Sequence, residues 1–160
     1  MDVWIGIGGN IGDVQETIEH AIEAIANEPT TRVVARAGFY RTRPVGPVDQ
    51  PDFLNTAIHI DTSMSPDALL AFLKETEAAL GRLATVRWGP RAIDLDILVF
   101  GDRIIDTASL TIPHRQLQNR RFVLAPLADI SPELVVPGIG RSARALLLEL
   151  TDDPDAVRPA

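Results

Sequence analysis

The chain has 160 residues, 46% of them hydrophobic, which fits one folded domain over residues 1–160 with a sizeable core. Its net charge of −7 argues against nucleic acid or an anionic membrane as the main partner, and its lack of cysteine excludes disulfides and thiolate metal sites. We find no signal peptide and no apolar run long enough to span a membrane, so we expect a cytoplasmic protein.

The N-terminal third predicts a strand, a helix and a second strand. Apolar residues alternate over 3–9 and indicate the first strand. Asp13 suits the N-cap of a helix that continues to about Glu28, and its inner face would be Ile18, Ala21, Ile22 and Ile25. A second strand is predicted over 33–40. Residues 41–52 contain three prolines and a glycine, so we expect a long irregular loop there.

The middle of the chain predicts another strand–helix–strand unit. Residues 53–62 alternate as a strand, and Ser65 can cap a helix that ends at Gly81. A fourth strand is predicted over 93–100. A Gly-Asp turn follows this strand and would make residues 103–105 its hairpin partner.

The C-terminal third predicts two short helices. Residues 113–121 are expected to be irregular or to form a single turn, and a helix over 122–130 would hold Pro126 in its first turn. A last helix is predicted over 142–150. The polar tail, 151–160, is expected to be frayed.

This order of elements favours an α+β fold of the ferredoxin-like type, with a mostly antiparallel sheet covered by helices. A doubly wound parallel sheet is the alternative. We favour the antiparallel arrangement because no helix joins the second predicted strand to the third.

Two acids lie in the fourth predicted strand. Asp94 and Asp96 are two residues apart, so they should project from one face, while Leu95 and Ile97 point toward the core. Like charges on one strand face repel each other, and a hard divalent cation would offset that repulsion. Mg²⁺ commonly uses one or two carboxylates together with substrate phosphates. The alternative is a pair of solvated acids on an edge strand.

Seven of the 15 basic residues lie between positions 82 and 121. Arg82, Arg87 and Arg91 precede the acidic strand and could bring guanidinium groups to a phosphoryl group. His114 could contact a phosphate oxygen, and Arg120 could bind a phosphate tail. The alternatives are a solvated basic loop and a structural histidine.

A flat ring could bind between aromatic side chains. Trp88 and Phe122 each lie beside an arginine, and Asn55 could read the polar edge of a heteroaromatic ligand near Phe53. Core packing is the alternative for these rings. The glycine-rich run over 6–12 lacks the lysine and spacing of a phosphate loop, so we interpret it as a backbone turn bordering the pocket.

These strings together resemble the 6-hydroxymethyl-7,8-dihydropterin pyrophosphokinase family of folate biosynthesis. The resemblance covers nearly the whole chain, and Arg-Trp-Gly-Pro-Arg-x-x-Asp-x-Asp at 87–96 is highly specific to that family. The other strings are Gly6-Ile7-Gly8-Gly9-Asn10, Phe39-Tyr40-Arg41-Thr42, Gly46-Pro47, Asp49-Gln50-Pro51-Asp52-Phe53-Leu54-Asn55, and Pro113-His114 before Asn119-Arg120.

The resemblance implies an α/β/α sandwich that transfers pyrophosphate from ATP to the pterin hydroxymethyl group and releases AMP. It implies small-molecule substrates, and we expect a monomer. The catalytic residues would be Arg82, Arg91, Asp94 and Asp96, with two Mg²⁺ ions held by the two acids. ATP contacts would come from Lys74, Glu77, Arg82, Arg91, Ile97, His114, Arg115 and Arg120. Pterin contacts would come from Thr42, Pro44, Val45, Phe53, Asn55, Trp88 and Phe122.

The sequence departs from the family pattern at four places. The loop over 83–86 is short and lacks a second basic residue just after Arg82. Arg43 replaces a proline, Arg115 replaces an aromatic residue, and Lys74 stands where an amide can occur. Two other functions remain open: another Asp-x-Asp transferase acting on nucleotide diphosphates, and a non-catalytic ferredoxin-like binding module.

Overall fold

The computed structural model describes residues 1–44, 46–81 and 92–160. Its centre is a six-stranded sheet in the order β5-β1-β4-β3-β8, with β2 paired to the other half of β4. The strands are β1 (Asp2–Gly9), β2 (Thr31–Arg36), β3 (Tyr40–Thr42), β4 (Phe53–Thr62), β5 (Asp94–Phe100) and β8 (Val157–Pro159). The helices are α1 (Val14–Ala26), α2 (Pro66–Ala79), α3 (Arg121–Ile130) and α4 (Ala143–Glu149).

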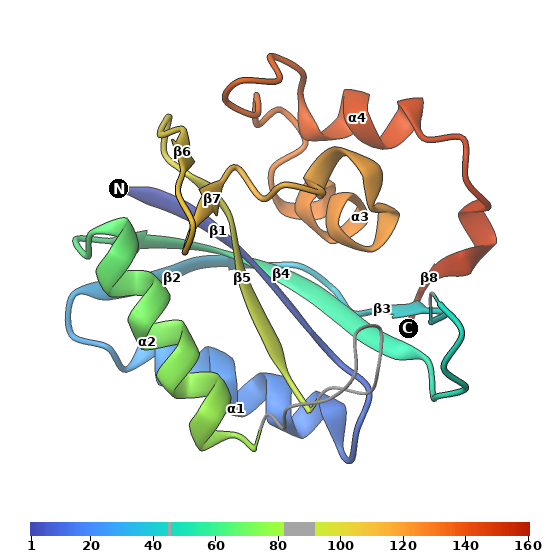
Figure 1. The fold of residues 1–160 in the computed structure, drawn as a ribbon, viewed down its shortest axis with the longest axis horizontal. Coiled ribbons are helices and arrows are strands. Elements are labelled where there is room, and N and C mark those ends of the chain that lie inside the picture. The colour runs from blue at the N-terminus through green and yellow to red at the C-terminus, as the bar shows by residue number, and fades with distance from the viewer. Residues whose placement is uncertain (45, 82–91) are drawn as a thin grey trace.

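Helices cover both faces of the sheet. Figure 1 shows α1 and α2 on one side, and α3 and α4 on the other. Every strand pair among the described residues is antiparallel, which confirms the predicted α+β ferredoxin-like sandwich. The doubly wound parallel sheet is therefore excluded for this part of the chain.

Helical periodicity explains the first face. Ile18, Ala21, Ile22 and Ile25 form one buried stripe of α1, as the sequence predicted. Burying each isoleucine contributes roughly 1.5–3 kcal/mol. The side chain of Asp13 accepts a hydrogen bond from the backbone N–H of Glu16 at 3.2 Å and so fixes the start of the helix.

The second face packs on the opposite side chains of the same strands. Trp4, Leu98 and Val99 are buried against α3 and α4, and the Trp4 indole N–H donates to Ser131 Oγ at 2.8 Å. The paired residues shift register after Trp4, so a bulge lets Leu98 and Val99 both reach this cluster. α3 packs mainly on β4 and also contacts β3 and β1.

The predicted strand over 33–40 is wrong in its extent. Two shorter strands replace it: β2 pairs with one half of β4, and β3 pairs with the other. In the gap, Thr56 Oγ1 lies 3.2 Å from the carbonyl of Ala37 and 3.1 Å from that of Gly38, and donates to them. Thr56 of β4 thus supplies the hydrogen bonds that these two backbone carbonyls would otherwise receive from a neighbouring strand.

Three further predictions need correction. Residues 103–105 do not form a hairpin partner for β5, because β6 (Ile105–Asp106) pairs with β7 (Thr111–Ile112). Pro126 lies in the second turn of α3, which begins one residue earlier than expected. The tail is not frayed: it forms a short 3-10 helix, Pro154–Ala156, and then β8.

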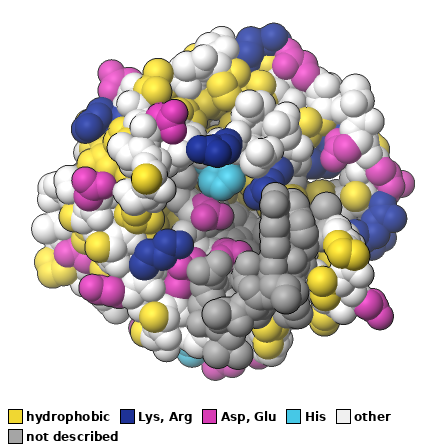
Figure 2. Space-filling model, viewed as in Figure 1, with side chains coloured by type: hydrophobic (Ala, Val, Ile, Leu, Met, Phe, Trp, Pro, Cys, Tyr) yellow, Lys and Arg dark blue, Asp and Glu magenta, His cyan; other side chains and the backbone are white. Residues whose placement is uncertain are grey.

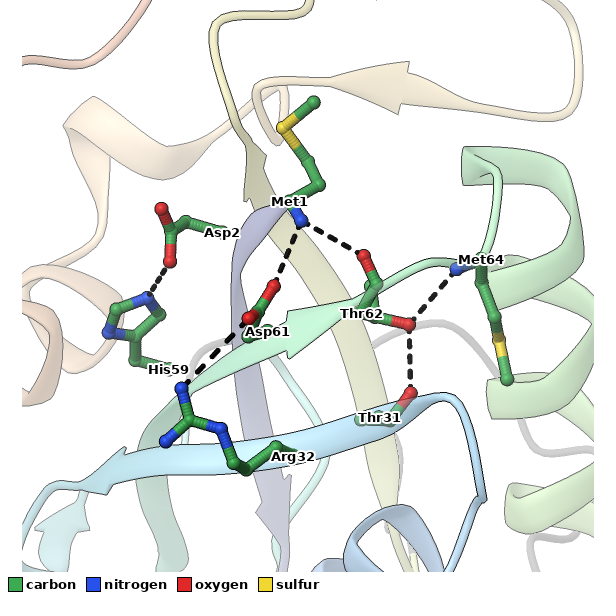
Figure 3. A network of polar contacts seen from close by, with 8 residues as sticks. All are labelled: Met1, Asp2, Thr31, Arg32, His59, Asp61, Thr62 and Met64. Atoms are coloured by element: carbon green, nitrogen blue, oxygen red, sulfur yellow. Dashed lines mark hydrogen bonds and ion pairs between the residues drawn. The ribbon is translucent and has the colours of Figure 1, made fainter.

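A polar network ties together the ends of β1, β2 and β4 (Figure 3). Asp2 lies opposite Asp61 in the ladder, where two like charges would repel each other. The terminal ammonium of Met1 donates to Asp61 Oδ1 at 2.9 Å, with an Arg32 guanidinium nitrogen 3.9 Å from Asp61 Oδ2. His59 Nε2 lies 2.9 Å from Asp2 Oδ1. The terminal ammonium and Arg32 therefore offset the charge of Asp61, while Asp2 is hydrogen-bonded to His59.

None of the helices in the described residues is both long enough and apolar enough to cross a membrane.

Candidate active site

A row of residues crosses four strands near the end of β1. Gly8 pairs with Asn55 on β4 and with Asp94 on β5, while Asn55 also pairs with Tyr40 on β3. Directly paired residues project from the same face of a sheet. Because neighbouring strands are about 4.8 Å apart, the Cα atoms of Asn55 and Asp94 are roughly 10 Å apart. Gly8 is the residue between them in the row.

Gly8 makes room for the Asn55 side chain. A Cβ atom at Gly8 would lie 2.3 Å from Asn55 Oδ1, a distance that real structures do not tolerate. Gly8 belongs to β1, so the glycine run is not simply the turn that the sequence indicated. The left-handed backbone expected of a turn occurs later, at Gly12, where φ is 72°.

Hydrogen bonding fixes the orientation of the Asn55 amide. Asn55 is buried, and its Nδ2 donates to Thr42 Oγ1 at 2.9 Å. The carbonyl oxygen of the amide then faces Gly8. Thr42 is itself buried and pairs with Phe53, which shares the sheet face of Asn55. The structure thus brings together three of the residues predicted for the pterin pocket.

The two strand acids lie as predicted. Asp94 and Asp96 face the same side as Gly8, whereas Leu95 and Ile97 are buried in the core against α1 and α2. Asp96 is exposed and Asp94 is half-buried. Because the Ile97 side chain is buried in the core, any nucleotide contact made there would use its backbone.

A buried carboxylate on α2 holds the strand between these acids. The backbone N–H of Leu95 donates to Glu77 Oε2 at 2.8 Å, and Lys74 Nζ lies 3.3 Å from Glu77 Oε1. Glu77 is only 2% exposed, so this hydrogen bond is shielded from water. The sequence did not reveal this contact, since nothing local pairs a helix acid with a distant backbone amide.

Among the described residues, no group of three or more histidine, cysteine, aspartate or glutamate side chains could hold a metal ion. The pair Asp94 and Asp96 nevertheless fits a hard cation, because two carboxylates on one face supply the oxygen ligands that Mg²⁺ prefers. The remaining ligands of such an ion would be substrate oxygens and waters.

His114 is held by backbone contacts on both sides. Its N–H donates to the carbonyl of Leu98 at 2.9 Å, and its Nδ1 accepts from the N–H of Gln116 at 3.2 Å. The neutral ring therefore carries its proton on Nε2. Burial lowers the pKa of His114, and the charge of Arg120 lowers it further. The guanidinium of Arg120 lies 5.6 Å from the centre of the Phe122 ring.

Some of the other predicted site residues lie in the described part of the chain, and some lie outside it. Pro44 is half-buried beside Thr42, and Arg115 is exposed beside His114. Figure 2 shows imidazole, cationic and carboxylate side chains gathered at the centre of one face of the molecule. The predicted residues that lie outside the described residues are Val45, Arg82, Arg87, Trp88 and Arg91.

The fold and this row of side chains define a three-layer α+β protein with a polar site on one face of an antiparallel sheet. Residues 4–132 match the family model of 7,8-dihydro-6-hydroxymethylpterin-pyrophosphokinase (HPPK). The chain belongs to that family.

Relatives across most of the chain support this membership. The chain is 44% identical over 154 residues to 2-amino-4-hydroxy-6-hydroxymethyldihydropteridine pyrophosphokinase of Methylorubrum extorquens, which covers 96% of this chain and 95% of the relative. It is 43% identical over 145 residues to the protein of the same name from Pseudomonas aeruginosa, covering 91% and 89%.

Solved structures show the same fold at low sequence identity. Plasmodium falciparum HPPK-DHPS wild type with pteroate superposes with a TM-score of 0.75 at 14% identity and covers 92% of this chain. A second HPPK-DHPS structure, in complex with substrates, gives a TM-score of 0.71 at 15% identity. This chain spans 44% of each of those two chains, so it corresponds to less than half of them.

Proposed function

We propose that this protein transfers the pyrophosphoryl group of ATP to the hydroxymethyl group of 6-hydroxymethyl-7,8-dihydropterin, giving the pterin diphosphate and AMP in folate biosynthesis. Family membership supports the reaction, because the relatives are named for it. The observation that carries the proposal is the row Asn55–Gly8–Asp94. In that row, the Asn55 amide, which would hydrogen-bond the pterin ring, lies roughly 10 Å from the Asp94 carboxylate, which would bind metal. This distance is enough for a pterin and its hydroxymethyl arm.

The pterin would bind on the Asn55 side of the row. The Asn55 amide is held by Thr42 and presents a polar edge that matches the hydrogen-bonding edge of a pterin. Phe122 would stack on the ring, and Phe53 and Pro44 would complete the wall. Two further members of this proposed pocket, Val45 and Trp88, lie outside the described residues.

Asp94 and Asp96 would hold two Mg²⁺ ions. Bound there, the ions would supply charge neutralisation for the triphosphate and lower the pKa of the attacking hydroxyl. The contribution of the chain is to keep the two carboxylates on one face, and the Glu77–Leu95 hydrogen bond fixes the backbone between them. Phosphoryl transfer depends mainly on such positioning and on electrostatic stabilisation.

The nucleotide would lie on the other side of the acids. The lowered pKa keeps His114 neutral near pH 7, so its Nε2–H would donate to a phosphate oxygen. Arg120 and Arg115 would supply positive charge, and Lys74, Glu77 and the backbone of Ile97 would border the nucleotide. Arg82 and Arg91, outside the described residues, would settle the phosphates as the transferred group moves.

This assignment disfavours the two alternative functions. A different Asp-x-Asp transferase accounts for the acids and leaves the buried Thr42–Asn55 pair without a purpose. A non-catalytic module does not explain why relatives covering most of this chain are pyrophosphokinases. We further propose a monomer that works in the cytoplasm, in keeping with its small-molecule substrates.

The test is a direct assay of the purified protein with ATP, Mg²⁺ and hydroxymethyldihydropterin. We expect AMP and the pterin diphosphate in equal amounts, and no AMP when Mg²⁺ is chelated. Formation of ADP, or AMP release that does not need the pterin, would overturn the proposal.

A further inference from the structure

The last ten residues form an ordered segment against the site. In β8, Val157 pairs with Thr42, and the ladder is extended by hydrogen bonds from Arg43 N–H to the Ala156 carbonyl at 3.0 Å and from Ala160 N–H to the Phe39 carbonyl at 2.9 Å. The family match ends at residue 132, so this segment lies beyond the part that the family model covers. β3 has only three residues, and β8 provides its second neighbour in the sheet.

Two successive acids in this segment bind arginines from two different walls of the site. Asp152 accepts from Arg121 Nε at 3.0 Å and from Arg121 Nη2 at 2.8 Å. Asp153 accepts from Arg43 Nη2 at 2.5 Å. Arg43 directly follows Thr42, and Arg121 lies directly before Phe122. The segment therefore joins β3 to the start of α3.

A third contact joins the same two walls. The Tyr40 hydroxyl donates to the Asp129 carboxylate, with 2.8 Å to each oxygen. Burial and the Asp129 carboxylate raise the pKa of Tyr40 to about 12, so the hydroxyl remains a donor throughout the physiological range. This bond reaches the far end of α3, whereas Asp152 holds its first residue.

The ladder between β3 and β8 contains an unfavourable pair. Arg41 and Arg158 lie directly opposite each other, and like charges in that position weaken a sheet. The two acids that precede β8 offset this repulsion by binding Arg43 and Arg121. The Asp152 pair should contribute more, because the Arg121 side chain is only 14% exposed, whereas Arg43 and Asp153 are each more than half exposed.

We infer that residues 151–159 act as a strap that positions the pterin pocket, with Asp152 and Asp153 as positioning residues that hold Thr42 and Phe122 at their working separation. Thr42 in turn orients the Asn55 amide through their buried hydrogen bond. This inference rests on the proposed assignment of Asn55, Thr42 and Phe122 to the pterin.

The test is the double substitution D152N/D153N, which keeps side-chain size and removes both charges. We expect the KM for hydroxymethyldihydropterin to rise roughly fivefold, since exposed and half-buried ion pairs are weak. The kcat and the KM for ATP should stay within about twofold. Hydrogen exchange at the amides of Arg43 and Ala160 should accelerate, while exchange in β1 should not change.

The matched control is D106N/D155N. It also removes two exposed carboxylates, one from β6 and one from the same tail, and neither belongs to the two ion pairs. We expect wild-type KM values and wild-type exchange. R158E would place a carboxylate opposite Arg41 and so strengthen the ladder. Hydrogen exchange at the amide of Arg43 should therefore slow in this variant, whereas it accelerates in D152N/D153N. If the double variant fails to fold, D153N alone tests the exposed pair.

Asn55→Ala separates the two possible failures. If Asn55→Ala raises the pterin KM while D152N/D153N leaves it unchanged, the strap inference is overturned and the pocket stands. If Asn55→Ala leaves the pterin KM unchanged, the pocket assignment falls, and the inference falls with it. An equal rise in the pterin KM for D152N/D153N and D106N/D155N would also overturn the strap, because it would reflect net charge alone.

Discussion

Acids lie beside both ends of β1 in different surroundings, with Asp2 and Asp61 at one end and Asp94 of β5 at the other. At one end, Asp2 faces Asp61, where the terminal ammonium of Met1 binds Asp61 and His59 is hydrogen-bonded to Asp2 (Figure 3). At the other end, the neighbours of Asp94 in the row are a glycine and an amide. The first arrangement staples strands together. The second sets a residue without a side chain between Asp94 and Asn55, the two residues on which the proposed site depends.

The pKa values at the two ends respond to different causes. The hydrogen bond from the terminal ammonium lowers the pKa of Asp61, and the charge of that ammonium adds to the effect. Burial lowers the pKa of His114 near the site. The pKa shift of Asp61 therefore comes from an ion pair, whereas that of His114 comes mainly from burial.

The largest difference between the ends should appear on removing an acid. Asp96→Ala should reduce turnover on the order of a thousandfold, because the transferred group would lose a carboxylate that fixes its charge-neutralising ions. Circular dichroism should show an intact fold, since Asp96 is exposed. The matched change at the staple end, Asp61→Ala, should leave turnover within about twofold. Near wild-type activity of Asp96→Ala would refute the metal assignment.

The next largest effect should come from Gly8→Ala. The added Cβ would meet Asn55 Oδ1 and push the amide off Thr42, so the pterin KM should rise roughly 30-fold, the cost of one misplaced buried hydrogen-bonding group. Gly6→Ala is the control in the same strand, because the nearest atoms to its Cβ would be side-chain carbons of Leu98, at 3.2 Å or more, and not the Asn55 amide. Similar KM values for the two variants would contradict the proposed role of Asn55.

A smaller effect is expected for Glu77→Ala. Loss of the acceptor for the Leu95 N–H should lower the free energy of unfolding by about 2 kcal/mol and reduce kcat about tenfold, since the strand carrying both acids would be less well fixed. Urea unfolding and steady-state kinetics measure the two effects. Glu75→Ala, at an exposed position of the same helix, should change neither.

The smallest effect concerns pH and stability. The folded state binds a proton at His114 less readily than the unfolded chain does, so this group lowers stability as pH falls below about 6.5. His114→Asn should remove that part of the pH dependence. Asp61 also has a lowered pKa, and it contributes stability that is lost only at more acidic pH, below about 4. Asp61→Asn should therefore reduce the slope of the acid limb, to which Glu19, Glu28 and Asp153 also contribute, and leave the limb near pH 6.5 unchanged. Urea unfolding from pH 8 to 3 would show whether the two windows separate.

Local spacing accounts for what the sequence predicted well. The buried stripe of α1 and the shared face of Asp94 and Asp96 both follow from periodicities of 3.6 and 2 residues, which the backbone imposes wherever a helix or strand forms. The strings that resemble the pterin pyrophosphokinase family added the reaction and a set of site residues. The family match and the relatives confirm the family, while the residue roles remain predictions.

The three largest errors share one cause, which is pairing between distant segments. The break between β2 and β3, the β6–β7 pair and the ordered tail all depend on which strand lies alongside. The tail looked frayed because its residues are polar. Its order comes from Arg43, Arg121 and the backbone of β3, and no local pattern announces these partners.

By itself, the sequence determined the alternation of strands and helices, the common face of the two acids and the family to which the chain belongs. These follow from short-range periodicity and from strings of neighbouring residues. Only the tertiary structure decided that Gly8 makes room for Asn55, that Glu77 binds the backbone between the acids, and that the tail joins β3 to the start of α3. Each of these contacts depends on ladder register and packing, which arise when segments distant in sequence meet.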